Sequence, residues 1–454
     1  MLLGNPSRRL ALRWWIAILL CLITTINYLD RQALAVAGPV LIEQFQLSNT
    51  EFGLINSAFL LAYALGHLAS GPLIDRVGTR RAFSIAVLAW SIVGMAHAAG
   101  RGFLGFLGLR ALLGITEAAN FPAAVKAVAE WFPRAERSLA VGIVTVGPGL
   151  GAVIAPPLLG GLVVTAGWQS AFLVPGAIGL LWLWIWQRWY RLPEEHPRLQ
   201  PEERALILAE REQAGDGAGS GSWRELAGYL RYREVWGLVL SRFANDGGFY
   251  FFIAWLPTYL AQARGFDIRE IAAFAWLPFL AADAGSLAGG WACRRLMAAG
   301  MSVDQARKRL IWAGALVVPL TLPAVSVDSA ALALGLIAVA MFAIQFKAAN
   351  LFALPIDLFA STRTGSIWGL FGAVGSLGGM AFVAATGWIS EHLAYAPVFW
   401  AVGVTQLLSA LFISWLIPRI QRLDGSGTAV EPAGSGTGSG TIPALDSPRR
   451  GECP

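Results

Sequence analysis

Asn27-Tyr28-Leu29-Asp30-Arg31 places an acid and a base next to each other inside an apolar run that covers residues 14–40. Each charge in a lipid-spanning helix costs a few kcal/mol, even on the lenient insertion scale. A chain keeps such charges where they face the interior of a helix bundle or a wet cavity, because only there do they meet polar partners. This stretch therefore predicts a membrane protein with a polar pathway between its helices.

The composition of the whole chain agrees with that prediction. Of its 454 residues, 56% are hydrophobic and 14% are charged, and the mean hydropathy is +0.58. A soluble domain has about 25% charged residues. The net charge of +6 does not indicate a nucleic-acid-binding protein, because its placement along the chain matters more than its sum. The three cysteines and four histidines are scattered, so we expect neither a metal site nor a disulfide framework.

Twelve apolar runs are long enough for a spanning helix, which needs about 20 residues. They are centred near residues 27, 62, 91, 113, 152, 179, 250, 282, 318, 343, 376 and 405. The sequence therefore predicts an all-α membrane protein with twelve transmembrane helices. The first run is too long for a signal peptide and lacks a cleavage site after it, so we expect it to be retained.

A long polar loop divides the predicted helices into six and six. We expect an N-terminus at residues 1–13, a six-helix bundle at 14–190, a central loop at 191–233, a second six-helix bundle at 234–418, and a tail at 419–454. Within the loop, residues 202–212 have helical character. The tail is rich in Gly, Ser and Thr and is predicted to be disordered.

Arginines concentrate in alternate loops. The loops after the second, fourth, sixth and eighth predicted helices are rich in them, whereas the opposite loops carry only Arg101, Arg264 and Arg269. By the positive-inside rule, both termini and the central loop are cytoplasmic. We expect a multi-pass protein of a bacterial inner membrane.

Two loops at equivalent places share a pattern. Gly71-x-x-x-Asp75-Arg76 follows the second predicted helix, and Gly290-x-x-x-Arg294-Arg295 follows the eighth. The shared skeleton indicates two related halves, the second of which lacks the Asp. Parallel repeats of this kind place a binding site at their interface, near the middle of the membrane.

The first of these loops resembles the signature loop of the major facilitator superfamily, in Gly71, Asp75, Arg76, Gly78 and Arg80. Residues 27–31, 110–122 and 167–172 resemble the anion:cation symporters of that superfamily, and residues 193–197, 255–260, 281–286 and 349–352 resemble its hexuronate transporters. The resemblance covers nearly the whole chain up to Pro418. It implies two six-helix pseudo-repeats and transport by alternating access. It also implies that the signature loop is a cytoplasmic gate that latches the two halves.

Arg31 is the first candidate for substrate binding, because a guanidinium fork matches the two oxygens of a carboxylate. Asp30 would hold Arg31 in place or exchange a proton. A salt bridge that only orients helices is the alternative. Tyr28 lies on roughly the same helical face and can add a hydroxyl. The resemblance implies substrate binding and coupling at these positions.

Arg110 and Glu117 point the same way from one predicted helix, about 10 Å apart along its axis, so they cannot pair with each other. Burial favours the neutral form of Glu117, whereas Arg110 or Arg31 favours its charged form. A carboxyl poised between these influences is suited to carry a proton, and the resemblance implies that use. We expect Glu117 to be the coupling site, with Asp30 second. A structural charge cluster is the alternative.

Further polar residues lie inside apolar runs. Tyr63 and Tyr250 are further candidates for substrate binding in a cavity; the alternative is that they pack or lie at the membrane interface. Lys347, with Asn350 one turn on, would bind a second carboxylate, pair with an acid (Asp357 or Asp283), or extend to the membrane surface. The roles of Asp246 and His67 stay open.

The sequence thus predicts a proton-coupled symporter of a small organic anion, such as a hexuronate or another sugar acid. Aromatic or dicarboxylic acids are the alternative substrates, and a drug or metabolite antiporter is the alternative activity. We expect no enzymatic activity, no cofactor besides the coupling proton, no nucleic-acid partner, and a monomer in the lipid bilayer. A phosphate-binding loop is absent from the sequence, which argues against ATP coupling in this chain. Lipid-linked enzymes and transporter-like sensors would need loop motifs or output domains that the sequence does not contain.

Overall fold

The computed structural model describes residues 11–212, 228, 230–359 and 361–420. Within these ranges it describes every side chain except those of residues 68, 71, 72, 134, 135, 138, 209–212, 361–366 and 368. All regular elements of the described part are helices. Most of the tail, predicted to be disordered, lies outside the described residues, as do residues 1–10 of the N-terminus.

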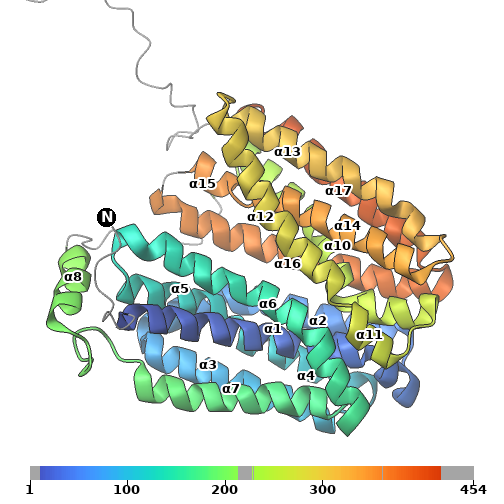
Figure 1. The fold of residues 1–454 in the computed structure, drawn as a ribbon, viewed down its shortest axis with the longest axis horizontal. Helices are drawn as coiled ribbons and strands as arrows, with labels where there is room; N and C mark the ends of the chain where they lie inside the picture. The colour runs from blue at the N-terminus through green and yellow to red at the C-terminus, as the bar shows by residue number, and fades with distance from the viewer. Residues whose placement is uncertain (1–10, 213–227, 229, 360, 421–454) are drawn as a thin grey trace, which may run out of the picture.

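The helices up to residue 189 form one group, here called the N-half (Figure 1). They are α1 (Leu12–Phe45), α2 (Asn49–Val77), α3 (Thr79–Ala96), η1 (His97–Ala99), α4 (Gly102–Glu117), α5 (Asn120–Trp131), α6 (Arg134–Ala166) and α7 (Ser170–Trp189). Helices α3 and η1 together form one predicted apolar run, and α4 and α5 together form another. This group therefore accounts for six spans.

The helices from residue 233 onwards form the second group, the C-half (Figure 1). They are α10 (Arg233–Arg264), α11 (Ile268–Phe274), α12 (Leu277–Ala298), α13 (Val303–Val317), η2 (Val318–Val325), α14 (Ala330–Leu351), α15 (Leu354–Leu358), α16 (Ser361–His392) and α17 (Ala396–Leu416). Three apolar runs are again split into two pieces. Pro278 and Pro355 lie in the first turns of α12 and α15, where a missing N–H ends the ladder of the preceding piece.

All twelve predicted apolar runs are therefore helical in the described part of the chain. Ten of the helical segments are long and apolar enough to cross a membrane. The other two, α2 and α10, are 29 and 32 residues long. In α10, Arg242 and Asp246 interrupt the apolar sequence. These two charges lie in the interior of the helix, where a functional site is expected, rather than at its ends.

Helix α8 (Pro201–Glu212) lies beside the start of α1 (Figure 1). The carboxylate of Glu203 accepts hydrogen bonds from the backbone N–H groups of Leu12 and Arg13, both at 3.2 Å. Arg13 also forms ion pairs with Glu203 at 2.8 Å and with Glu136 of α6 at 2.7 Å. An anion at the first turn of a helix is favoured by the helix dipole. These contacts attach the helix of the central loop to the N-half.

Hydrogen bonds join the two halves near the start of α2 and the ends of α10 and α16. Asn49 and Gln262 exchange amide hydrogen bonds of 3.2 and 3.0 Å, and Glu391 accepts one of 2.8 Å from the backbone of Thr50. Gly387 permits this approach, because a Cβ there would lie 2.5 Å from the carbonyl oxygen of Asn49. At the opposite end, Figure 1 shows α5 and α15 set apart. The molecule is thus closed at the Asn49 end.

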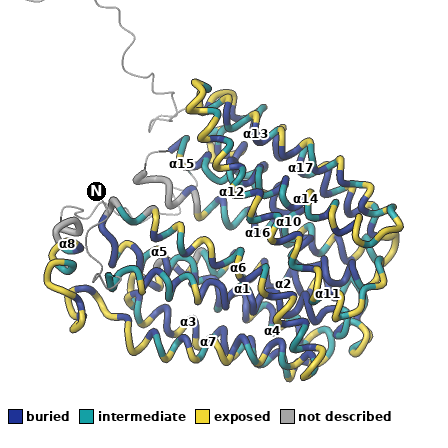
Figure 2. The backbone as a smooth tube through the Cα atoms, in the orientation of Figure 1, coloured by how far each residue is buried: buried dark blue, intermediate teal, exposed yellow. Residues whose placement is uncertain are grey.

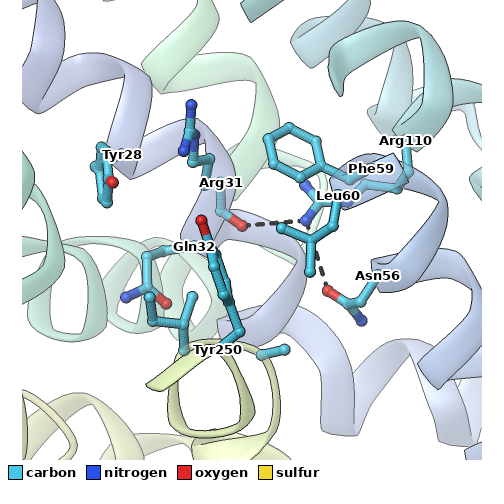
Figure 3. Close-up of a pocket in the computed structure, with 10 residues that line it drawn as sticks. Tyr28, Arg31, Gln32, Asn56, Phe59, Leu60, Arg110 and Tyr250 are labelled. Atoms are coloured by element: carbon cyan, nitrogen blue, oxygen red, sulfur yellow. Dashed lines mark hydrogen bonds between the residues drawn. The ribbon is translucent and has the colours of Figure 1, made fainter. Parts of the chain in front are cut away.

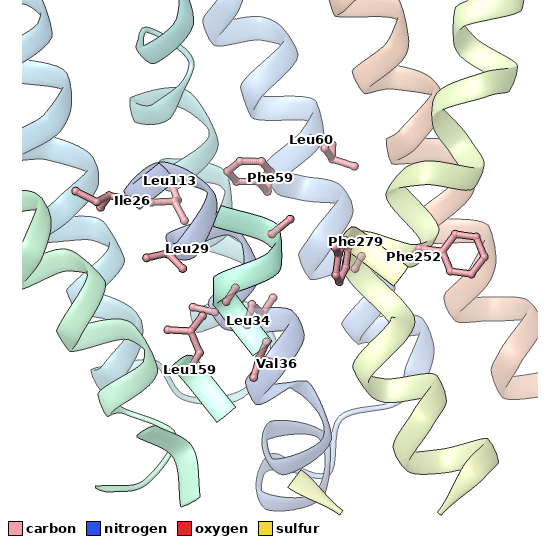
Figure 4. Packing of buried hydrophobic residues seen from close by; sticks show 14 of the residues in the cluster. Ile26, Leu29, Leu34, Val36, Phe59, Leu60, Leu113, Leu159, Phe252 and Phe279 are labelled. Carbon is pink, nitrogen blue, oxygen red and sulfur yellow. The ribbon is translucent and has the colours of Figure 1, made fainter. Parts of the chain in front are cut away.

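Buried residues concentrate between helices, while exposed residues follow the outer faces (Figure 2). One cluster crosses from the N-half to the C-half (Figure 4); it includes Leu29, Phe59, Leu113, Leu159, Phe252 and Phe279. Large apolar side chains such as Leu287, Trp184 and Trp415 are 77%, 64% and 68% exposed. An outer surface this apolar is suited to contact lipid rather than water.

Candidate substrate and coupling site

The centre of the N-half contains a buried ion pair between α1 and α4. Nε of Arg31 donates to Oε2 of Glu117 at 2.8 Å, and the two side chains are 8% and 0% exposed. Burying such a pair costs free energy of desolvation. Removing one partner destabilises the protein further, because it leaves a buried charge without compensation. Glu117 is too far from Arg110 along α4 to pair with it, and its partner is Arg31.

Three aromatic rings surround the guanidinium of Arg31. Its central carbon lies 4.7 Å from the ring centre of Tyr28, 5.2 Å from that of Phe59 and 4.2 Å from that of Tyr63. Cation–π contacts strengthen when water is excluded. The rings therefore hold the guanidinium in one orientation, with its charge turned toward a limited set of acceptors.

Asp30 does not hold Arg31, so that expectation is wrong. Neighbouring residues on an α-helix are about 100° apart, so their side chains leave the helix in different directions. Asp30 is 3% exposed and points toward α3, where a Cβ on Gly94 would lie 3.3 Å from its Oδ1. Its Oδ2 has no hydrogen-bond partner in the described part of the chain. Asp30 is a second buried carboxyl, separate from the Arg31–Glu117 pair.

Arg110 contacts the other side of the same centre (Figure 3). Its Nη2 lies 3.5 Å from both the carbonyl oxygen of Arg31 and Oδ1 of Asn56, and its guanidinium is 4.7 Å from the ring centre of Phe59. Two of its nitrogens, Nε and Nη1, have no hydrogen-bond partner among the described residues. Arg110 is thus a buried cation with donors to spare.

Two cavities lie next to these charges. The smaller, of about 30 Å³, has room for a single water. It is lined by Tyr28, Arg31, Gln32, Asn56, Phe59, Leu60, Arg110, Tyr250, Ile253 and Ala254 (Figure 3). The larger, of about 230 Å³, lies between the halves; its polar lining comes from Tyr28, Thr145, Arg242, Asp246, Tyr250, Asp283, Ser286 and Gln345. Tyr28 and Tyr250 belong to both linings and stand between the two spaces.

The larger cavity contains an ion pair that the sequence reasoning did not find. Arg242 and Asp246 of α10 are 2.7 Å apart. The guanidinium of Arg242 also lies 3.7 Å from the ring centre of Phe352 and 4.8 Å from that of Phe371. The signal was present in the sequence, because the two charges are four residues apart inside an apolar run and so share a helical face.

Lys347 lines neither cavity and is fully buried. Its Nζ donates to the carbonyl oxygen of Gln406 at 3.3 Å. The suggested pairing with Asp357 is wrong, because Asp357 pairs with Arg307 at 3.0 Å. Pairing with Asp283 is wrong too, since no ion pair joins them in the described part of the chain. The ammonium does not extend to the membrane surface, because its backbone and side chain are enclosed by neighbouring helices.

Asn350 also lies outside both cavity linings. Its amide nitrogen donates to the carbonyl oxygens of Gly289 and Phe346 at 3.3 and 3.2 Å, and its Oδ1 accepts from Arg307 at 3.3 Å. These contacts tie α14 to α12 and α13. The proposed substrate roles of Lys347 and Asn350 stay predictions, and in this conformation both side chains are occupied by protein partners.

The signature loop makes its contacts within the N-half. Asp75 pairs with Lys126 of α5 at 2.6 Å, and Arg80 donates to the carbonyl oxygen of Gln187 at 2.5 Å. Gly78 joins α2 to α3 with φ of +83°, a conformation that favours glycine. Arg76 is exposed, and the surroundings of Gly71 lie outside the described side chains. The gate between halves therefore stays a prediction for another conformation.

His67 contacts Tyr63 edge-on, with ring centres 4.4 Å apart. Within the described residues, no group of three or more His, Cys, Asp or Glu could hold a metal ion. The arrangement is suited instead to receiving an anion: Arg31 and Arg110 line the smaller cavity, and Arg242 lines the larger one between the two halves.

The sequence model of the family described as the Major Facilitator Superfamily matches residues 20–380 of this chain. The chain belongs to this superfamily. It is 32% identical to the hexuronate transporter of Escherichia coli (strain K12) over 407 residues, 89% of this chain and 94% of that protein. It is 36% identical to the galacturonate transporter of Dickeya chrysanthemi over 283 residues, 62% of this chain and 81% of that protein.

Solved structures of this superfamily have the same fold. A bacterial homologue of the human lysosomal transporter Spinster, in an inward-facing and occupied conformation, aligns with a TM-score of 0.72 at 18% identity, covering 91% of this chain and 98% of that one. The xylose transporter XylE from E. coli aligns with a TM-score of 0.66 at 17% identity, covering 90% and 97%. The protein is therefore a multi-pass membrane transporter of the major facilitator fold and not an enzyme.

Proposed function

We propose that this transporter moves a sugar acid, such as a hexuronate, together with a proton. The observation that carries the proposal is the buried Arg31–Glu117 pair, enclosed by three aromatic rings, with Arg31 in the wall of the smaller cavity. The sugar-acid transporters among the similar proteins support this substrate class. The polar lining of the larger cavity suits a polyhydroxylated molecule better than an apolar drug.

The coupling follows from competition for one guanidinium. Glu117 neutralises Arg31 when no substrate is present. A substrate carboxylate can take that place only if the negative charge of Glu117 is removed, because two anions next to one buried cation would leave one of them uncompensated. A proton on Glu117 removes it. Proton and anion therefore bind together, and the charge of the centre stays the same.

Asp30 and Arg110 supply a second acid and a second cation at the same centre. Asp30 has one oxygen without a partner, and Arg110 has unused donors. In this proposal Asp30 is the second proton-accepting group. The positive charge of Arg110 offsets negative charge at the centre while the proton and the anion enter. Both remain inside the N-half throughout the cycle.

In the transport cycle the molecule alternates between two conformations, each of which is closed at one end. In the present conformation the halves meet at the Asn49–Gln262 end. The arginine-rich loops lie at the other end, which the positive-inside rule assigns to the cytoplasm. We infer that the conformation faces inward, that both termini are cytoplasmic in a bacterial inner membrane, and that one copy of the chain suffices for transport.

Uptake into proteoliposomes tests the proposal. Radiolabelled galacturonate or glucuronate should accumulate when an inward proton gradient is imposed and not when the gradient is absent. In Glu117→Gln, accumulation should be lost while exchange of internal for external substrate persists, because a neutral side chain leaves Arg31 open to the anion. Glu43→Gln is the matched control, since Glu43 is exposed at the end of α1.

Each outcome has a distinct meaning. Accumulation by Glu117→Gln equal to the wild type would overturn its coupling role. Uptake of aromatic carboxylates without any sugar acid would overturn the substrate class. Absence of transport for every anion tested would overturn the proposed function of Arg31.

A further inference from the structure

We propose that Asp283 recognises the hydroxyl end of the substrate and excludes a second carboxylate. The transported anion is then a polyhydroxylated monocarboxylate, such as a hexuronate or aldonate, rather than a dicarboxylate of the aldarate type. This inference rests on the proposed function and names the selectivity of the same cavity.

Asp283 is located in the wall of the cavity between the halves. It lies on α12, and Ser286 of the same helix and Gln345 of α14 line the cavity with it. The structure gives Asp283 neither an ion pair nor a hydrogen bond with any described residue. An acid that is committed to the fold would have such a partner, as Asp246 and Asp357 do. The carboxyl of Asp283 is free to bind what enters the cavity.

The opposite wall of the cavity leaves space for this carboxyl because it has a glycine there. Gly149 of α6 faces it so closely that a Cβ at residue 149 would lie 2.5 Å from both oxygens of Asp283. Because α6 belongs to the N-half and α12 to the C-half, the carboxyl lies where the two halves meet. A substrate held there touches both halves, as a substrate that drives their relative motion must.

The chemistry of a carboxylate decides what it can bind. An ionised Asp only accepts hydrogen bonds. Neighbouring hydroxyl groups of a sugar can donate to its two oxygens, whereas a second substrate carboxylate has no proton to donate. Such a carboxylate would also meet a like charge in a site with little water. Asp283 therefore favours hydroxyl groups at the position where an aldarate carries its second acid.

The cations of the site do not compensate for this repulsion. Arg242 lines the cavity but is already 2.7 Å from Asp246. Lys347 is fully buried and lies outside the lining. Arg31 is the receptor for the first carboxylate in the proposed cycle. An aldarate would thus bring a second negative charge to a cavity wall in which Arg242 is already paired with Asp246.

The test is competition against radiolabelled galacturonate uptake by unlabelled galactonate and unlabelled galactarate. Both competitors are open-chain acids, and they differ only at the end where galactarate carries its second carboxylate. In the wild type we expect galactarate to compete at least roughly tenfold more weakly. In Asp283→Asn the ratio of the two inhibition constants should fall by roughly tenfold or more, because the repelling charge is gone. Direct binding to purified protein, measured calorimetrically, should give the same change in ratio.

Two further variants keep the test decisive. Asp328→Asn is the matched control: Asp328 is exposed outside the helices, and its ratio should equal that of the wild type. Asp283→Ser removes the charge with a smaller side chain and should reproduce the effect of Asp283→Asn. Agreement between the two variants separates loss of the charge from any steric effect of the amide on the approach of Gly149.

The outcomes separate this inference from the function on which it rests. An unchanged ratio in both Asp283 variants, with galacturonate still bound, overturns the role of Asp283 alone. A wild type that prefers galactarate overturns it as well and assigns the second carboxylate to Arg242. A wild type that binds no sugar acid overturns the proposed function and this inference together.

Discussion

Nε of Arg31 lies 2.8 Å from Oε2 of Glu117, and this contact joins α1 to α4 at a point where both side chains are buried. The pair is neutral as a whole, so exchanging Glu117 for a substrate anion leaves the electrostatics of the bundle unchanged. In the proposed cycle the contact is the resting state of the site, and Glu117 occupies the place that the substrate carboxylate would take.

Arg31→Lys should bind sugar acids poorly although the positive charge is kept. A lysine cannot make two parallel hydrogen bonds to a carboxylate and does not stack flat on rings. Loss of one charge-assisted hydrogen bond weakens apparent affinity roughly 10- to 100-fold. Uptake kinetics would measure this as a higher KM. Arg269→Lys, at an exposed position of α11, is the control, and equal KM values in the two variants would contradict the prediction.

The ring of Tyr63 is expected to matter more than its hydroxyl. The guanidinium of Arg31 lies 4.2 Å from the centre of that ring. Tyr63→Phe keeps the ring and should bind substrate nearly as well as the wild type. Tyr63→Leu loses a cation–π contact of about 1 to 2 kcal/mol, or roughly five- to thirtyfold in affinity. Calorimetric titration with galacturonate checks the difference, and equal losses in both variants would assign the role to the hydroxyl instead.

Gly149→Ala should block transport through its effect on Asp283. The added methyl group would lie 2.5 Å from the carboxyl oxygens, so α6 and α12 must separate or the carboxyl must turn. Either change alters the cavity, and we expect uptake to fall at least roughly tenfold, since overpacking typically costs 1–3 kcal/mol. Gly161→Ala on the same helix has open space around it and should transport normally. Similar uptake by both variants would argue against the close approach.

The amide pair at the closed end should set the balance between conformations. Asn49 and Gln262 bond each other across the halves, and Tyr395 adds a hydrogen bond of 2.8 Å to Gln262. In the double variant Asn49→Ala/Gln262→Ala, this end should open more often. The readout is the rate at which a membrane-impermeant thiol reagent labels Thr258→Cys, in a background without native cysteines.

Thr258 is fully buried on α10, so its labelling requires opening. The rate should rise by up to roughly thirtyfold in the double variant, as expected for the loss of two hydrogen bonds across the halves worth about 1 kcal/mol each. Thr258→Cys alone in the same background is the reference. Identical rates would mean that other contacts, such as that of Glu391 with Thr50, keep this end closed.

The sequence predicted the helices well because lipid imposes a length and an apolar composition on any spanning segment. It also placed the charges of Arg31, Arg110 and Glu117 inside the membrane. Partners were harder to predict, because they depend on how helices are rotated and packed. Arg31 pairs with a residue 86 positions away and not with its neighbour Asp30.

Two further differences have the same origin. The sequence suggested Asp357 or Asp283 as partners of Lys347, whereas the packing of α17 brings the carbonyl oxygen of Gln406 to it. Arg242 could have been found, since Asp246 follows it by one helical turn. Asp283 illustrates the limit: its residue type suggested a partner for a cation, whereas the structure shows it facing a cavity.

Tyr28 and Tyr250 line both cavities, one from each half, and this has a consequence for energy conservation. A symporter wastes its gradient when the coupling ion slips through without cargo. The two phenol rings are shared by the larger cavity and by the smaller one that Arg31 lines. In the proposed symport, a substrate that displaces these rings would also open a route for the proton, so the gradient would be used only when a molecule is carried.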